Sequence, residues 1–371
     1  MYCRRSAKNP DEPNAREWIL LKKGNISLLI LFFVLLLVLP CLSIQAKSTA
    51  ARKRTHPSAS SAAASPQPKP ASAAPQVKKA VSSAAATQKG SRVFRIYDKT
   101  SGKVLSVAEP EFLRGTVAAE MSPDSPQEAL KAQTVAAYTY YSRLRQLHQK
   151  QPDPALQGAD FSCETGKWNI YETEAQRRQR WKEDSAKYSA NLSAAVDSVY
   201  GQVLRSGSAL VNATYYAISS GCTENAAAVW GKEYPCLLPV ASPGDIYASG
   251  YLSTKVLSAS QFQAAASTLG CTLSGDASHW VGSIQRTASG MVSSLTLGGK
   301  SVKGTDARTA FDLRSANFSI AFANGCFTFT VKGYGHDVGM SQTGAVSMAK
   351  QGSTYQQILS WYYPGSTLGK L

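Results

Sequence analysis

The chain has 371 residues and a formal net charge of +16. The first 90 residues contain 14 Lys and Arg against 3 Asp and Glu, whereas residues 91–371 contain 26 against 21. Because most of the excess charge lies in the first quarter, the composition argues against a nucleic-acid-binding domain, and we expect no nucleic-acid partner. After that quarter the length allows one domain of about 280 residues.

An uncharged apolar stretch, ISLLILFFVLLLVLPCLSI, covers residues 26–44 and approaches the ~20 residues that a membrane-spanning helix needs. Basic side chains precede it at Arg4, Arg5, Lys8, Arg16, Lys22 and Lys23. By the positive-inside bias, residues 1–25 are predicted to be a cytoplasmic tail and residues 26–45 a single-pass anchor in the cell membrane. A signal peptide cleaved near Ala46 is the alternative, although the apolar run exceeds the usual ~7–15 residues.

Residues 46–90 consist almost wholly of Ala, Ser, Pro, Lys and Thr. With so little large apolar surface, such a segment cannot offset the entropy lost on folding. We therefore predict a flexible basic linker here and a folded extracytoplasmic domain over residues 91–371.

The domain begins with VFRIYD, residues 93–98, which alternates as a strand does. Apolar residues recurring every three or four positions predict a helix over residues 126–147, with Ser125, Pro126 and Glu128 forming a capping box. Glu120 is then expected on the loop before this helix, flanked by Ala118, Ala119 and Met121. A carboxyl group in apolar surroundings has a raised pKa and is suited to donate a proton, while a solvated loop glutamate is the alternative.

The middle of the domain mixes both kinds of element. Residues 175–200 predict a helix with an exposed basic face that includes Arg177, and residues 201–219 predict a hairpin that turns at Gly207. In SSGCTENAAAVWG, residues 219–231, either Thr223 or Asn225 is placed to cap a short helix. Residues 264–269 predict a further helix, and residues 284–302 two strands with turns at Gly290 and Gly298. Helices among antiparallel strands favour a single mixed α+β domain.

Five cysteines fall in the domain: Cys163, Cys222, Cys236, Cys271 and Cys326. An extracytoplasmic location permits disulfides, and Cys222–Cys236 and Cys271–Cys326 are the pairings considered. The spacings typical of zinc sites are missing from the sequence. A Cys-His hydrolase that uses Cys222 together with His336 is a further hypothesis.

The motif GYGHDVGMSQTG covers residues 333–344, and YQQILSWYYPGSTL covers residues 355–368. Four glycines in twelve residues disfavour a helix or an ordinary strand. They fit a tight backbone passage that turns His336, Ser341 and Gln342 toward a shared cleft.

These C-terminal segments resemble the signature of the stage II sporulation protein D and amidase-enhancer family. Three further blocks are similar to family blocks and follow the same order: RGTVAAEMSPDSPQEALKAQTVAAYTYY, SSGCTENAAAVWG and GTDARTAFDLRSANF. Together they cover nearly all of residues 92–371.

The resemblance implies a lytic transglycosylase that cuts peptidoglycan strands, preferentially those without peptide stems, between N-acetylmuramic acid and N-acetylglucosamine. The family's acid falls on Glu120. One carboxyl group suffices, because the C6 hydroxyl of the substrate attacks the anomeric carbon. A substrate-binding wall is expected from Tyr216, Ser219, Gly221, Thr223, Glu224, His336, Ser341 and Gln342. The implied partners are a cell-wall amidase or endopeptidase and a membrane protein of the engulfment machinery.

Departures from the family pattern leave an alternative open. Tyr138 stands where an arginine is usual, Ser220 replaces a glycine, and Cys222 follows Gly221. Lys167 and Trp168 replace a His-Cys pair, so Cys163 is a weak candidate for a zinc ligand and no cofactor is expected. A glycan-binding protein that activates an amidase without cutting is the alternative function.

Overall fold

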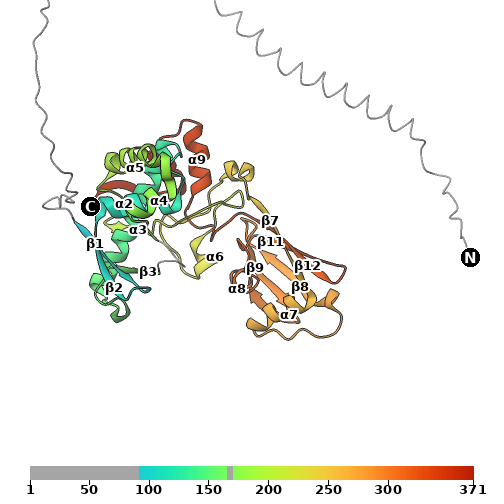
Figure 1. Ribbon diagram of the computed structural model, residues 1–371. Coiled ribbons are helices and arrows are strands. Elements are labelled where there is room, and N and C mark those ends of the chain that lie inside the picture. Colours follow the sequence, from blue (N-terminus) through green and yellow to red (C-terminus); the bar gives the residue numbers. More distant parts are fainter. Residues whose placement is uncertain (1–91, 165–169) are drawn as a thin grey trace, which may run out of the picture. The chain divides into compact units, whose positions relative to one another are not determined.

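The computed structural model describes residues 92–164 and 170–371 (Figure 1). The predicted tail, anchor and linker, and the Lys167-Trp168 pair, lie outside these described residues. Within the described ranges no helix is long and apolar enough to cross a membrane.

The described chain mixes helices with strands that pair mostly antiparallel. The strands are β1 Val93–Asp98, β2 Lys103–Ala108, β3 Phe161–Cys163, β4 Gln202–Ser206, β5 Ala209–Leu210, β6 Tyr215–Tyr216, β7 Leu252–Ser258, β8 Val281–Arg286, β9 Val292–Leu297, β10 Lys300–Lys303, β11 Phe318–Ala323, β12 Cys326–Lys332, β13 Met340–Ser341 and β14 Thr367–Lys370. The α-helices are α2 Glu109–Glu120, α3 Gln127–Lys150, α4 Glu174–Trp181, α5 Ser185–Val199, α6 Ala226–Trp230, α7 Ala259–Thr268, α8 Gly304–Ala310, α9 Gln342–Lys350 and α10 Tyr355–Tyr362. Short 3-10 helices are η1 Pro154–Leu156, η2 Lys182–Asp184, η3 Pro243–Tyr247 and η4 Ala277–His279.

The predicted strand at residues 93–98 is confirmed as β1. It pairs antiparallel with β2 and parallel with β3, and it alternates exposed and buried side chains. Its buried Phe94 packs edge-on against Phe112 of α2. Helices α2, α3 and α5 contact one another beside this sheet (Figure 1). The first core therefore lies between a small sheet and a helical layer.

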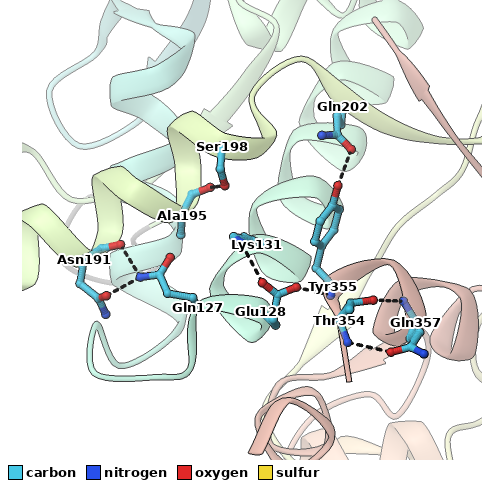
Figure 2. Close-up of polar contacts among 10 residues, drawn as sticks. All are labelled: Gln127, Glu128, Lys131, Asn191, Ala195, Ser198, Gln202, Thr354, Tyr355 and Gln357. Atoms are coloured by element: carbon cyan, nitrogen blue, oxygen red, sulfur yellow. Dashed lines mark hydrogen bonds and ion pairs between the residues drawn. The ribbon is translucent and has the colours of Figure 1, made fainter. Parts of the chain in front are cut away.

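The predicted helix at residues 126–147 is confirmed as α3, but its capping box is wrong. Pro126 itself occupies the N-cap position with extended backbone, and no side chain caps the helix. The Glu128 carboxylate instead accepts hydrogen bonds from Lys131, at 2.7 Å, and from the backbone N–H of Tyr355, at 2.7 Å (Figure 2). Glu128 thereby ties α3 to the start of α10.

The helical stretch predicted at residues 175–200 is divided in two. Lys182 adopts a positive φ of 48°, which ends α4, and α5 begins at Ser185 after η2. Arg177 is not exposed as expected: its guanidinium is buried and pairs with Glu111 at 2.9 Å. This ion pair, between a buried guanidinium and a half-buried carboxylate, joins α4 to α2.

Residues 252–331 form a second core of their own. The antiparallel sheet β11-β12-β7 and the meander β10-β9-β8 enclose it with α7 and α8, and Phe262 and Phe327 stack in its centre at 3.8 Å between ring centroids. The expected turns at Gly290 and Gly298 are present with positive φ, although they join three strands rather than two.

The middle of the chain follows its local signals. Strands β4 and β5 pair antiparallel across Gly207, but the second strand of the predicted hairpin ends at Leu210, and Tyr215–Tyr216 pairs with β13 instead. The Asn225 side chain caps α6, as one of the two expected residues. Cys222, Cys236, Cys271 and Cys326 are free, so the two considered disulfides are not formed. Cys236 and Cys271 pack in different apolar cores, where they act as small apolar side chains.

Candidate active site

Glu120 lies at the end of a helix rather than on a loop, because α2 extends over residues 109–120. Its side chain remains exposed and lines a cleft of about 300 Å³ together with Met121, Ile218 and Gln342, among others. Although solvent reaches the carboxyl group, the cleft walls remove enough water to raise its pKa. The amide of Gln342 donates to the Glu120 Oε2 at 3.0 Å and partly offsets this rise. Glu120 thus combines access for a substrate with a bias toward the protonated form.

The glycine-rich motif brings Gln342 to Glu120 across 222 residues of sequence. Strand β13 pairs parallel with β6, and the N–H of Thr343 donates to the carbonyl of Ala217 at 3.0 Å. Gly339 has a φ of 84°, and a Cβ there would lie 2.1 Å from the Thr214 carbonyl oxygen. The predicted tight backbone passage is therefore real at Gly339, and it sets Gln342 at the first turn of α9.

A second carboxyl group, Asp245 of η3, joins two of the sequence motifs behind the cleft. Ser341 donates to Asp245 Oδ1 at 2.8 Å, and the Ser219 hydroxyl donates to Oδ2. Asp245 is completely buried, and this desolvation raises its pKa while the serine hydroxyls act in the opposite direction. Sequence reasoning missed Asp245, because a lone acid after Ser-Pro-Gly carries no recognisable motif.

Ser219 and Ser341 are therefore completely buried at this carboxylate and do not line the cleft around Glu120. Ser341 has a further task, since its hydroxyl accepts from the N–H of Gly344 and caps α9. Both serines hold the backbone segments that line the cleft. Their position is one layer behind the surface that a substrate would meet.

His336 is half-buried between the rings of Tyr216 and Trp230, with both ring centroids 5.3 Å away. Its Nδ1 accepts from the N–H of Val338 at 3.1 Å, and the ring also bonds to the backbone of Tyr215. Burial, with help from the nearby Arg308 charge, lowers the pKa of His336 to about 4. A neutral ring with backbone partners holds the motif in shape and does not serve as an acid.

The remaining predicted binding residues make contacts within the protein near Ser219 and His336. The buried Glu224 accepts from Thr287, at 2.5 Å, and Thr223 bonds to the backbone of Leu238 and Val240. Gly221 adopts a φ of 108°, beside Ile246 of η3. Tyr216 is buried, and within the described residues its hydroxyl has no hydrogen-bond partner.

Two tyrosines that the sequence did not single out lie near the acid. Tyr141 and Tyr215 hydrogen-bond to each other, and both lie close enough to interact electrostatically with the Glu120 carboxylate. Tyr215 precedes the predicted Tyr216 on β6. Because neighbouring residues of a strand point to opposite faces, only one side chain of the Tyr-Tyr pair can point toward Glu120, although within the described residues neither tyrosine lines the cleft.

Tyr138, which stands where an arginine is usual, points to a different carboxylate. Its hydroxyl donates to the completely buried Glu109 at 2.6 Å, and Glu109 also pairs with Arg145 at 2.7 Å and accepts from Tyr200. Within the described residues, Tyr138 does not line the Glu120 cleft. The departure at position 138 therefore changes a buried network.

The cysteines give little support to other chemistry. Burial raises the pKa of the Cys222 thiol, so it is not an activated nucleophile for a Cys-His pair. Cys163 is buried beside Asp98, with 3.9 Å between its sulfur and a carboxylate oxygen. Across residues 92–164 and 170–371, no group of three or more His, Cys, Asp or Glu side chains is arranged to hold a metal ion.

Comparison with known proteins identifies the family. The family model described as Stage II sporulation protein matches residues 97–205. Stage II sporulation protein D of Bacillus amyloliquefaciens is 35% identical over 73% of this chain and 76% of its own length, and that of Bacillus subtilis (strain 168) is 34% identical over 79% and 83%. The amidase enhancer of Bacillus subtilis (strain 168) is 27% identical over 69% of this chain but only 40% of its own length. The chain therefore belongs to the stage II sporulation protein D family.

Proposed function

We propose that this protein is a peptidoglycan lytic transglycosylase in which Glu120 is the general acid and base. The observation that carries this proposal is the carboxyl group of Glu120, which is open to a cleft, has a raised pKa and contacts one neutral donor, Gln342. A proton donor for a glycosidic oxygen needs these three properties at once.

In the proposed reaction Glu120 gives its proton to the leaving glycosidic oxygen as the bond from the anomeric carbon of N-acetylmuramic acid breaks. The C6 hydroxyl of the same sugar then attacks that carbon and returns its proton to the Glu120 carboxylate. Hydrolysis would instead need a second carboxyl group to position a nucleophile or water. Of the described residues that line the cleft, Glu120 is the only acid, which suits the intramolecular route.

The test uses glycan strands from which an amidase has removed the peptide stems. The full chain is incubated with these strands, and 1,6-anhydro products are sought by mass spectrometry. Glu120→Gln is the matched negative control, because it preserves size and the exposed position. Intact strands with the wild-type protein, or equal product from Glu120→Gln, would overturn the proposal.

A non-catalytic role as an amidase activator is a second candidate, favoured by the similarity to a protein named amidase enhancer. It predicts that the chain stimulates a cell-wall amidase on intact peptidoglycan and that Glu120→Gln stimulates it equally. Loss of stimulation in Glu120→Gln would argue for cleavage as the activity that matters.

The cellular setting is also part of the proposal. Residues 26–45 anchor the chain in the cell membrane with its N-terminus in the cytoplasm, and the domain works on the wall with an amidase or endopeptidase and a membrane partner during engulfment. The test fuses, after residue 90, a reporter enzyme that is active only in the cytoplasm. The reporter should be inactive if the chain after the anchor lies outside the cytoplasm. Carboxyl chemistry of this kind needs no cofactor, so cleavage should survive treatment with a chelator.

A further inference from the structure

A second cavity lies between α6 and the core formed by residues 252–331. Its volume is about 420 Å³, within the ~300–1,000 Å³ that is usual for small-molecule sites. Helix α6, the start of β9 and the start of α8 line it, and Figure 1 shows α6 beside α8 and β9. Among the described residues, none lines both this cavity and the Glu120 cleft, so the two are separate.

Contacts within the protein hold the walls of this cavity in place. The carboxylate of Glu224, next to the residue that caps α6, accepts from the hydroxyl of Thr287 at 2.5 Å, in the turn between β8 and β9. Gly304 begins α8, and a Cβ there would overlap the carbonyl oxygen of Val292. This close approach sets the first turn of α8 directly against β9. The cavity is therefore preformed.

The lining combines an apolar wall with two opposite charges. Trp230, which is 40% exposed, and Met291 contribute to the apolar wall. Lys303 and Asp306 are exposed side chains at the start of α8 that line the same cavity. They do not pair with each other, and among the described residues neither side chain has another ion-pair or hydrogen-bond partner. The cavity thus offers one cation and one anion, both available to a ligand, beside an apolar surface.

We propose that this cavity binds the zwitterionic head group of an amino acid, in which one carbon carries both a free ammonium and a free carboxylate group. Lys303 pairs with the carboxylate and Asp306 with the ammonium group, through charge-assisted hydrogen bonds. The methylene chain behind the head group packs on Trp230 and Met291. A neutral sugar would leave both charges unmatched, and a simple anion or cation would match only one.

The ligand that fits this chemistry at a cell wall is a peptide stem with diaminopimelate, whose side chain ends in such a head group. The inference goes beyond the proposed function, because it concerns the peptide and not the glycan bond. Only the choice of a peptide stem over a free amino acid rests on the proposed setting at the wall.

The test titrates the full chain with the tripeptide L-alanyl-γ-D-glutamyl-meso-diaminopimelate in a calorimeter. Two matched probes differ from it only at the head group: one has the ammonium group acetylated, and the other has the carboxylate converted to a primary amide. We expect each modified probe to bind about tenfold more weakly, because each loses one charge-assisted contact at an exposed site. Free meso-diaminopimelate carries the same head group, and tighter binding of it than of the tripeptide would overturn the peptide stem as the ligand.

Two substitutions assign each charge to its half of the head group. Asp306→Asn should abolish the preference for the free over the acetylated ammonium group and keep the preference for the carboxylate over the amide. Lys303→Gln should do the reverse. Glu174→Gln and Arg178→Gln are the matched controls, because they remove exposed charges on α4 outside the cavity lining, and they should leave all three affinities unchanged.

Equal affinity of the wild-type protein for the three peptides would overturn the inference, and so would an equal loss on all three with Asp306→Asn. The wild-type comparison needs no variant, so it decides the question even where a substitution prevents folding. Binding of a peptide-free disaccharide in place of the tripeptide, weakened by Lys303→Gln, would also overturn it and make the cavity a sugar site.

The two proposals fail separately, because this binding is measured without a glycan strand. Head-group binding without any anhydro product from the wild-type protein would support the peptide site and overturn the transglycosylase. Anhydro product from a protein that does not distinguish the three peptides would overturn the peptide site alone.

Discussion

Glu120 and Asp245 are two carboxyl groups with raised pKa values in one site, and they differ in access and in partners. Glu120 is exposed to a cleft and receives one hydrogen bond, from Gln342. Asp245 is completely buried and receives serine hydroxyls from both motifs that form the cleft wall. A raised pKa alone therefore does not identify a proton donor. Under the proposed function, the accessible carboxyl group of Glu120 is the reactive one, whereas Asp245, whose two carboxylate oxygens both accept serine hydroxyls, holds the cleft wall in place.

The largest expected effect is on catalysis. Glu120→Gln should lower the rate of anhydro product formation by about 100-fold or more, the usual contribution of a general acid. Because the side chain is exposed, the free energy of unfolding should change by no more than about 0.5 kcal/mol. Product formation by mass spectrometry and unfolding in urea measure the two quantities. A stable variant with full activity would overturn the role proposed for Glu120 as the general acid.

Asp245→Ala should act mainly on stability. It removes the acceptor of two buried hydroxyls, and we expect the free energy of unfolding to fall by about 3 kcal/mol. Cleavage should fall as well, since Ser341 caps the helix that carries Gln342. Glu174→Ala, at an exposed helical acid paired with Arg178, is the control and should leave the urea midpoint nearly unchanged. An Asp245→Ala protein of wild-type stability would show that the serines do not depend on this carboxylate.

His336 provides a pH test of the same structural layer. The unfolded chain protonates this ring near its ordinary pKa of 6.5, while the folded protein resists protonation down to about 4. The unfolded state therefore binds more protons between these values, and stability should fall as the pH is lowered from 6.5 to 4. The His336 contribution is on the order of 3 kcal/mol over the whole window. Urea unfolding at several pH values should show a shallower fall for His336→Phe than for the wild type, and parallel curves would contradict the assignment.

The sequence predicted elements whose signals are local. Periodic apolar residues located α3, alternation located β1, and Gly207 and Asn225 gave a turn and a helix cap. Helix α2 was not predicted, and Gly115 in its middle disfavours a helix by its backbone freedom. A Cβ at Gly115 would lie 2.4 Å from the Glu172 carbonyl oxygen, so this glycine serves close packing rather than a helix end. The local rule for glycine was outweighed by a contact 57 residues away in sequence.

Glu120 could be proposed from the sequence because its role depends on one side chain. Asp245 could not, because its role depends on its hydrogen-bond partners. The desolvated surroundings of Glu120 were readable from its apolar neighbours, and the structure adds Gln342 as its donor. The opposite held for Asp245, whose role depends on Ser219 and Ser341 from distant segments. His336 was expected to bind substrate because it is the lone histidine of its motif. Its ring instead bonds to backbone groups, which no sequence pattern shows.

Gln342→Met should shift the pH profile of cleavage without removing it. The Gln342 amide stabilises the Glu120 carboxylate and so lowers its pKa, against the larger effect of desolvation. Loss of the donor should raise the pKa of Glu120 further, and the decline of activity with rising pH should move to higher pH. The pH dependence of kcat/KM measures this shift. Gln351→Met, at an exposed position after α9, is the matched control, and a shift toward lower pH in Gln342→Met would contradict the proposed hydrogen bond.

The smallest effect is expected at Tyr138, and it decides what the departure from the family pattern means. Tyr138→Phe removes one of the donors to the buried Glu109 but leaves Tyr200 and Arg145 in place, so the free energy of unfolding should fall by about 1 kcal/mol. Cleavage should be unchanged, because Tyr138 does not line the cleft among the described residues. Unfolding in urea and kcat/KM on stem-free strands separate the two effects. A loss of kcat/KM at unchanged stability would instead place position 138 at the substrate, and the missing arginine would then favour the non-catalytic activator over the transglycosylase.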